Sequence, residues 1–150
     1  MAYRFGHLAL FVSNLRAAEA FYLQAFGMEV LFREAVADDG NWYTLRPGQS
    51  WGDAEQAGAE IGMVALQRDE LNLPIFRGEP RSGTVLEIGI TVPADEIDAI
   101  SADRPESATR LPHEHGDLFF KDPYGYTWHI TNAAQPFESN GARDGQWLDL

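Results

Sequence analysis

The chain has 150 residues, no cysteine and a formal net charge of −12. The lack of cysteine excludes disulfides, thiolate metal sites and cysteine nucleophiles. The strong negative charge disfavours nucleic acid and anionic membranes as partners. No apolar run reaches the length of a membrane span, and the N-terminus lacks the pattern of a signal peptide, so we expect a cytoplasmic protein.

The first predicted elements are a strand, a helix and a second strand. Residues 5–12 alternate between two faces, which predicts a half-buried strand. Apolar residues then recur every three or four positions from Leu15 to Ala25, which predicts an amphipathic helix. Asn14 is placed to cap this helix at its start, and Gly27 is placed to end it. Met28–Arg33 follows as the second strand.

Two further strands are predicted in the first half, at Trp42–Arg46 and at Glu60–Gln67. The residues between them, PGQSWGDAEQAGA, are rich in glycine, alanine and polar side chains, which indicates a loop. Arg68–Ser82 contains two prolines and several charged residues, so we interpret it as the connection between two halves.

The second half repeats the order of elements seen in the first. Residues 84–92 alternate like the first strand, and the segment DEIDAISAD predicts a short helix. Later strands are predicted at Ala108–Leu111, Leu118–Lys121 and Tyr126–Thr131. The segment Asp122–Gly125 has the residue types of a type I turn and should join the last two strands. Each half therefore contains a strand, a helix and three strands, which indicates an internal duplication.

Three polar residues interrupt apolar strand patterns at related places. His7 and Glu87 occupy the same step when FGHLALFV is laid over VLEIGITV, and His129 lies between Trp128 and Ile130. If the alternation holds, all three side chains point away from the helices. Two imidazoles and a carboxylate on one concave face would offer three ligands to a divalent ion such as Fe(II), Mn(II), Zn(II) or Ni(II). A packed histidine, a solvated glutamate and a structural Glu87–His129 pair are the alternatives.

Two stretches, GHLALFVSNLRAAEAFYLQAFGMEV and FFKDPYGYTWHI, resemble the vicinal oxygen chelate superfamily. This superfamily includes glyoxalase I, extradiol dioxygenases, and fosfomycin- and bleomycin-resistance proteins. The resemblance implies an α+β fold in which two βαβββ modules pair into a cupped mixed sheet around a central cavity, and it suggests a homodimer. In one domain of residues 1–150, the first module would then span about 4–67, a linker 68–83, the second module about 84–132, and a C-terminal tail 133–150.

The resemblance also implies where metal ligands would lie, because the superfamily takes them from the first and last strands of each module. His7 falls on the first of these positions. Glu87 and His129 fall on the two positions of the second module, with histidine and glutamate exchanged relative to the more frequent order. In the last strand of the first module, taken as IGMVALQR, the matching residue is Ala65, which cannot bind metal. The resemblance therefore implies three protein ligands, as in extradiol dioxygenases.

Two further residues are weaker catalytic candidates. His115 lies in PHEHGD, a stretch typical of a solvated loop. If it points inward, His115 would serve as a proton relay or a substrate contact. Tyr43 lies on the predicted third strand, beside Trp42 and Arg46, where it would line the cavity.

Two functions of different classes stay open. The first is a divalent-metal-dependent enzyme, a dioxygenase or a glyoxalase-like lyase or isomerase, whose small substrate chelates the metal through neighbouring oxygens. The second is a binding protein that sequesters a small molecule without catalysis, as bleomycin-resistance relatives do. For that function the net charge of −12 suits a cationic ligand, and Trp42, Trp51 and Phe11 offer stacking surfaces. The chain has no phosphate-binding loop, serine-hydrolase elbow or zincin motif.

Overall fold

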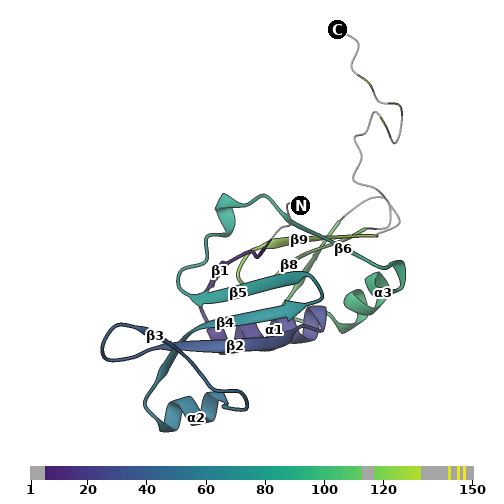
Figure 1. Cartoon of the computed structure of the whole chain (residues 1–150). Helices are drawn as coiled ribbons and strands as arrows, with labels where there is room; N and C mark the ends of the chain where they lie inside the picture. The colour runs from purple at the N-terminus through teal and green to yellow at the C-terminus, as the bar shows by residue number, and fades with distance from the viewer. Residues whose placement is uncertain (1–5, 113–116, 133–141, 143–144, 146, 148–150) are drawn as a thin grey trace, which may run out of the picture.

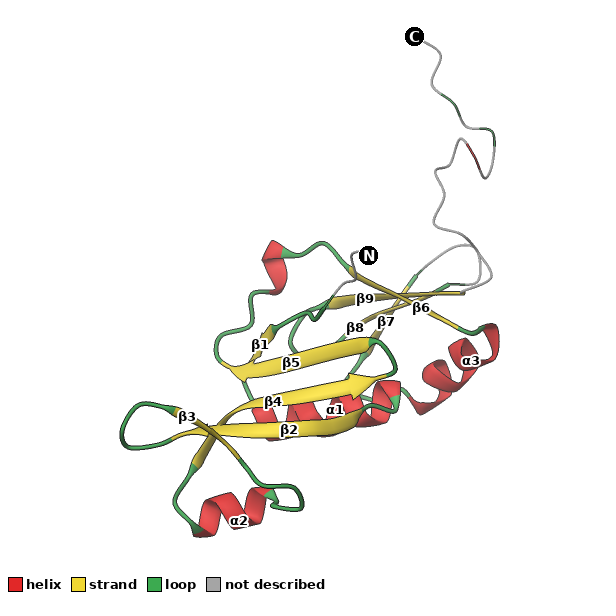
Figure 2. Cartoon of the chain, viewed as in Figure 1, coloured by secondary structure: helices red, strands yellow, loops and turns green. Residues whose placement is uncertain are grey.

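The computed structural model describes residues 6–112, 117–132, 142, 145 and 147. Two sheets carry the fold: sheet A has the strand order β1-β5-β4-β2-β3, and sheet B has the order β6-β9-β8-β7. Figure 1 shows α1 against sheet A and α3 beside sheet B. Two mixed sheets with a few helices confirm the expected α+β class (Figure 2). Within the described ranges, no helix is long and apolar enough to cross a bilayer.

The strand–helix–strand order at the start of the chain is confirmed, but the first strand is shorter than predicted, because residues 6–9, His7 among them, precede it without strand structure. The unit consists of β1 (Leu10–Val12), α1 (Leu15–Phe26) and β2 (Glu29–Val36). The Asn14 side chain accepts a hydrogen bond of 3.0 Å from the amide of Ala17, and so caps α1. Gly27 ends the helix at a φ of 58°, in the left-handed region that glycine adopts without a Cβ penalty. Both predicted helix boundaries therefore hold.

The interpretation of residues 68–83 as a mere connection is wrong, because this segment contains a strand. After β3 (Trp42–Thr44) and β4 (Glu60–Arg68), the chain forms β5 (Leu71–Arg77). This strand pairs antiparallel with β4 and parallel with β1, and it buries Leu73 and Ile75 completely. The sequence did not predict this strand because the segment contains Pro74. Proline has no backbone N–H to donate to a neighbouring strand and argues against a central strand.

The predicted loop between β3 and β4 contains a helix, α2 (Trp51–Gln56). A capping box starts it: Ser50 accepts a hydrogen bond from the amide of Asp53, and the Asp53 carboxylate accepts one from the amide of Ser50. The Trp51 indole donates to the carboxylate of Glu19 on α1 at 3.0 Å. These contacts, together with burial of Ala54, order a segment whose composition favoured a loop.

The second half follows the predicted order after a short 3-10 turn (Ser82–Thr84). Its elements are β6 (Ile88–Val92), α3 (Ala94–Asp103), β7 (Thr109–Leu111), β8 (Leu118–Lys121) and β9 (Thr127–Asn132). In the β8–β9 turn, the amide of Gly125 donates to the carbonyl of Asp122 at 3.1 Å, as the type I turn predicts. Strand β6 pairs in parallel with β9, as β1 does with β5, so both halves share one topology, except that sheet A has an additional edge strand, β3, and therefore four strands after α1 instead of the predicted three.

The core lies between α1 and both sheets, and its aromatic residues come from both halves of the chain. Tyr22 and Phe26 of α1 pack on Trp128 of β9, with ring centroids 5.8 Å and 4.9 Å apart. Together with Phe21 these α1 residues are buried, as predicted. Burying such rings contributes the largest apolar areas of any side chains. The helix of the first half is therefore fixed to the sheet of the second.

A buried carboxylate, Asp122, sits at the junction of the two halves and is 4% exposed. Its Oδ2 accepts hydrogen bonds from the Tyr22 hydroxyl at 2.6 Å and the Trp128 indole at 2.9 Å. Its Oδ1 accepts from the amides of Tyr124 and Tyr126 at 2.9 Å and 3.0 Å. Four donors satisfy one buried anion, which meets the condition for burying a charge. Asp122 thus joins α1 to the β8–β9 hairpin.

This arrangement predicts a loss of stability in alkali. Burial raises the pKa of Tyr124 to about 12, and burial followed by the charge of Asp122 raises the pKa of Tyr22 well above its usual range. An unfolded chain ionises these phenols near pH 10, before the folded protein does. The stabilising contribution is therefore complete below about pH 10 and is lost as pH rises towards each folded-state pKa, which for Tyr124 is about 12, by up to about 1.4 kcal/mol per pH unit. Urea unfolding across this range measures the slope.

The control for the alkaline slope is Tyr124→Phe, which removes one of the two ionising groups. We expect its free energy of unfolding to fall less steeply with pH than that of the unchanged protein. Equal slopes in the two proteins would show that Tyr124 does not contribute.

Candidate functional site

Glu87 and His129 come together on the face of sheet B that points away from α1. The alternation of β9 holds: Trp128 and Ile130 are fully buried, and His129 between them faces the other side. Glu87 lies one residue before β6, the strand that pairs with β9. Its Oε1 lies 3.4 Å from Nδ1 of His129. Two of the three predicted ligands are therefore neighbours.

A second carboxylate, which the sequence did not predict, contacts the other ring nitrogen of His129. Oδ2 of Asp117 lies 2.8 Å from Nε2. Phe119 on β8 is the cross-strand partner of His129 and stacks on its imidazole, with centroids 3.9 Å apart and planes 20° apart. Asp117 and Phe119 are two residues apart and so share one strand face. This parity reveals Asp117 only in combination with the register that pairs Phe119 with His129.

Neither of the other two candidates that the structure describes, His7 and Tyr43, makes a hydrogen bond or ion pair with Glu87 or His129. His7 is exposed. Tyr43 lies on β3, at the edge of sheet A opposite β1, and donates to Asp39 at 2.7 Å. His115 lies outside the described residues.

The donor types at Glu87 and His129 suit a divalent metal. Two ligands bonded to one ion at about 2.1 Å each, at a tetrahedral angle, lie about 3.4 Å apart. The Glu87–His129 separation of 3.4 Å matches this spacing. Asp117 lies at the opposite ring nitrogen, so the two carboxylates do not converge on one point. Accordingly, no group of three or more His, Asp or Glu side chains in the described residues is arranged to hold a metal.

The position in the first half that corresponds to His129 is Pro74, not Ala65. Register decides this: Leu10 pairs with Ile75 across β1 and β5, and Ile90 pairs with Ile130 across β6 and β9. When FGHLALFV is laid over VLEIGITV, Leu10 matches Ile90, so Pro74, the residue before Ile75, matches His129, the residue before Ile130. Ala65 pairs with Pro74 on β4. Neither alanine nor proline has a side chain that binds metal. We therefore still expect no fourth protein ligand, and Pro74 replaces Ala65 as the residue at that position.

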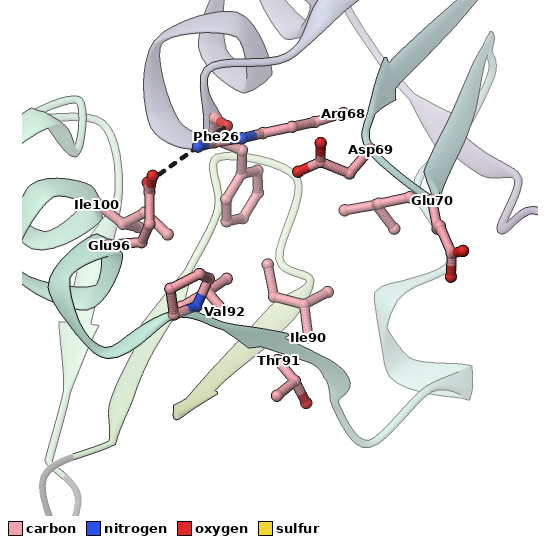
Figure 3. A pocket seen from close by; sticks show the side chains of 11 residues that line it. Phe26, Arg68, Asp69, Glu70, Ile90, Thr91, Val92, Glu96 and Ile100 are labelled. Carbon is pink, nitrogen blue, oxygen red and sulfur yellow. Dashed lines mark hydrogen bonds and ion pairs between the residues drawn. The ribbon is translucent and has the colours of Figure 1, made fainter. Parts of the chain in front are cut away.

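A separate hollow of about 350 Å³ lies where the two halves meet (Figure 3). Apolar side chains such as Phe26 and Ile100 line it, and Arg68 of β4 bridges to Glu96 of α3 at 2.9 Å. Arg68 also donates to the carbonyl of Phe26 at 2.5 Å. His7, Glu87 and His129 are not among the lining residues. The hollow is therefore distinct from the Glu87–His129 pair.

An aromatic row covers the outer face of sheet A. Phe76 contacts Phe11 at 6.4 Å and Trp42 at 6.2 Å between centroids. Trp42 reaches across β4 because Gly62 has no side chain: a Cβ at that position would lie 2.9 Å from the indole. Phe11 is 42% exposed and Trp42 is 48% exposed. Trp51 does not belong to this row, since its indole faces Glu19.

Comparison with known proteins places the chain and its fold in a family. The chain matches the model of the Glyoxalase/Bleomycin resistance protein/Dioxygenase superfamily over residues 4–130. The chain belongs to this superfamily. The match confirms the resemblance to the vicinal oxygen chelate superfamily drawn from the sequence. No curated protein sequence matches the chain.

Solved structures of this superfamily share the fold at low sequence identity. FosX, a fosfomycin resistance protein from Listeria monocytogenes, is 15% identical, with 98% of this chain and 100% of FosX covered and a TM-score of 0.61. A FosX variant complexed with Mn(II) and 1S,2S-dihydroxypropylphosphonic acid is 15% identical, with 95% and 98% covered and a TM-score of 0.58. A superfamily enzyme from Burkholderia phytofirmans is 15% identical, with 85% and 96% covered and a TM-score of 0.54.

Proposed function

We propose that this protein is a divalent-metal-dependent enzyme whose metal ligands are Glu87, His129 and His7. The observation that carries the proposal is the 3.4 Å approach of Glu87 to Nδ1 of His129. A carboxylate and a neutral imidazole are ligands for Fe, Mn, Zn or Ni. A FosX structure that contains Mn(II) supports a divalent metal in this fold. The proposed substrate is a small molecule with two neighbouring oxygens.

The residues around the pair suit such a substrate. When bound, a divalent ion supplies Lewis-acid stabilisation of an enediolate or catecholate, the dioxygenase-like or glyoxalase-like class of chemistry. Phe119 covers one side of the His129 ring. Gly89, the partner of His129 on β6, leaves open space on that strand, because a Cβ there would meet no atom within 4 Å. A planar or small substrate would lie over Gly89.

We propose that the enzyme is a homodimer and that His7 reaches the metal from a second copy. In the described chain His7 belongs to the segment that leads into sheet A, whereas Glu87 and His129 flank and form sheet B. The exposed aromatic row of sheet A gives the chain an apolar face of the kind that protein interfaces use. Mixing His7→Ala protein with His129→Ala protein would restore activity in a mixed dimer only if the two residues act across subunits.

Equilibrium dialysis against Mn(II) tests the metal directly. We expect about one equivalent per chain for the unchanged protein and below about a tenth for His129→Ala and Glu87→Ala at the same free Mn(II), because each variant removes a ligand. Asp98→Ala on α3 is the control, since it removes an exposed carboxylate outside the site. Below about a tenth of an equivalent in the unchanged protein would refute metal dependence.

The aromatic row supports a second candidate, a binding protein that sequesters a small cationic or aromatic molecule. Phe11 and Trp42 offer exposed ring faces, and the net charge of −12 favours cations. In that case Trp42→Ala would weaken ligand binding, measured by equilibrium dialysis with cationic glycopeptides, and His129→Ala would not. Turnover of a bound compound would refute a purely sequestering role.

A further inference from the structure

Nδ1 of His129 and Oε1 of Glu87 lie 3.4 Å apart, the spacing of two ligands that share one divalent ion. The Asp117 carboxylate accepts a hydrogen bond from Nε2 at 2.8 Å, so the proton of a neutral imidazole resides on Nε2. Nδ1 then presents a lone pair to a carboxylate oxygen 3.4 Å away. A divalent cation placed between these two acceptors would be bound by both. This geometry distinguishes the two ring nitrogens.

We infer that Asp117 is a positioning residue: it holds the proton of His129 on Nε2 and thereby presents Nδ1, together with Glu87, to the metal. The inference rests on the proposed function. A carboxylate hydrogen-bonded to the non-ligating nitrogen of a metal-binding histidine fixes the ring and makes the ligating nitrogen more basic. The side chains of Asp117 and His129 are 17% and 21% exposed, so water competes little for this hydrogen bond.

The neighbouring strands hold the imidazole in this orientation. Phe119, two residues after Asp117, stacks on the ring at 3.9 Å, which limits its rotation out of plane. The parallel partner of His129, Gly89, adds no side chain beside it. Rotation of the ring by a half-turn would move Nδ1 away from Glu87 and break both contacts. Asp117 and Phe119 on β8 therefore fix the direction in which His129 presents its lone pair.

Two measurements test the role of Asp117, and one of them needs no metal. In the metal-free protein, ¹⁵N NMR of the histidine side chains should show the Nε2–H form of neutral His129. In Asp117→Ala protein the two tautomers should mix. By equilibrium dialysis, Asp117→Ala should lose about 10- to 100-fold in Mn(II) affinity, the usual cost of removing an outer carboxylate. Asp98→Ala should retain both the tautomer and the affinity.

The outcomes separate this inference from the proposed function. If the unchanged protein binds Mn(II) but Asp117→Ala binds it equally well, the inference is wrong and the metal site stands. If the unchanged protein has neutral His129 in the Nδ1–H form, the inference is wrong whether or not metal binds. If the unchanged protein binds no Mn(II), the proposed function fails, and with it the part of the inference that concerns metal.

Discussion

Asp122→Ala should destabilise the protein by about 4 kcal/mol, the largest single effect that we expect. The reason is that one carboxylate satisfies four buried donors: the Tyr22 hydroxyl, the Trp128 indole and two amides of the β8–β9 turn. Removing it leaves these donors without an acceptor in a site that is 4% exposed in the folded protein. Urea unfolding followed by tryptophan fluorescence measures the change in the free energy of unfolding.

The matched control is Tyr22→Phe, which removes one of the four donors and keeps the carboxylate. Because the other three hydrogen bonds remain, we expect a cost of only about 1 kcal/mol. If Asp122→Ala costs no more than Tyr22→Phe, Asp122 does not join the two halves as described.

Glu19→Ala should have the second largest effect, about 3 kcal/mol. Glu19 is 8% exposed, and its carboxylate accepts two hydrogen bonds from Arg33, at 2.8 Å and 2.6 Å, and one from Trp51. The hydrogen bond to Glu19 also raises the pKa of the Arg33 guanidinium above its usual value. Without Glu19, a half-buried cation and an indole N–H lose their partner, and α2 loses its anchor to α1. Thermal and urea unfolding measure this loss.

An exposed pair gives the control for Glu19. Arg16 donates to Glu55 at 2.9 Å, and both side chains are more than half exposed, at 61% and 63%. Such surface pairs contribute little, so Glu55→Ala should cost less than about 1 kcal/mol. Equal costs for Glu19→Ala and Glu55→Ala would contradict a buried anchoring role for Glu19.

The parts of the fold that the sequence predicted are those in which local signals and tertiary packing agree. Helix α1 combines a 3.6-residue apolar period with Asn14 and Gly27 at its ends, and its boundaries hold. The sequence did not predict strand β5, because a proline such as Pro74 argues against a central strand. Pairing with β1 and β4 makes the extended conformation of this segment favourable. The sequence did not predict helix α2, because its order depends on the hydrogen bond from Trp51 to Glu19, which is far away in the sequence.

The candidate site shows the same division. Strand parity placed His129 on the face away from Trp128, and the duplicated pattern placed Glu87 near it, so these two residues could be predicted. Asp117 could not be assigned without the register that sets Phe119 opposite His129. The sequence assigns the matching position in the first half to Ala65 because it indicates a linker where β5, the last strand of that half, lies. Register between strands is a long-range property, and the alternation of one strand does not reveal it.

The proposal that Glu87 and His129 hold a divalent metal is tested most directly by an anomalous-scattering map from crystals grown with Mn(II). We expect one strong peak per chain, bonded to the Glu87 carboxylate and to Nδ1 of His129, with Asp117 on Nε2 of the same ring. A map with no peak at this pair, from crystals that hold Mn(II) elsewhere or not at all, would contradict the metal site.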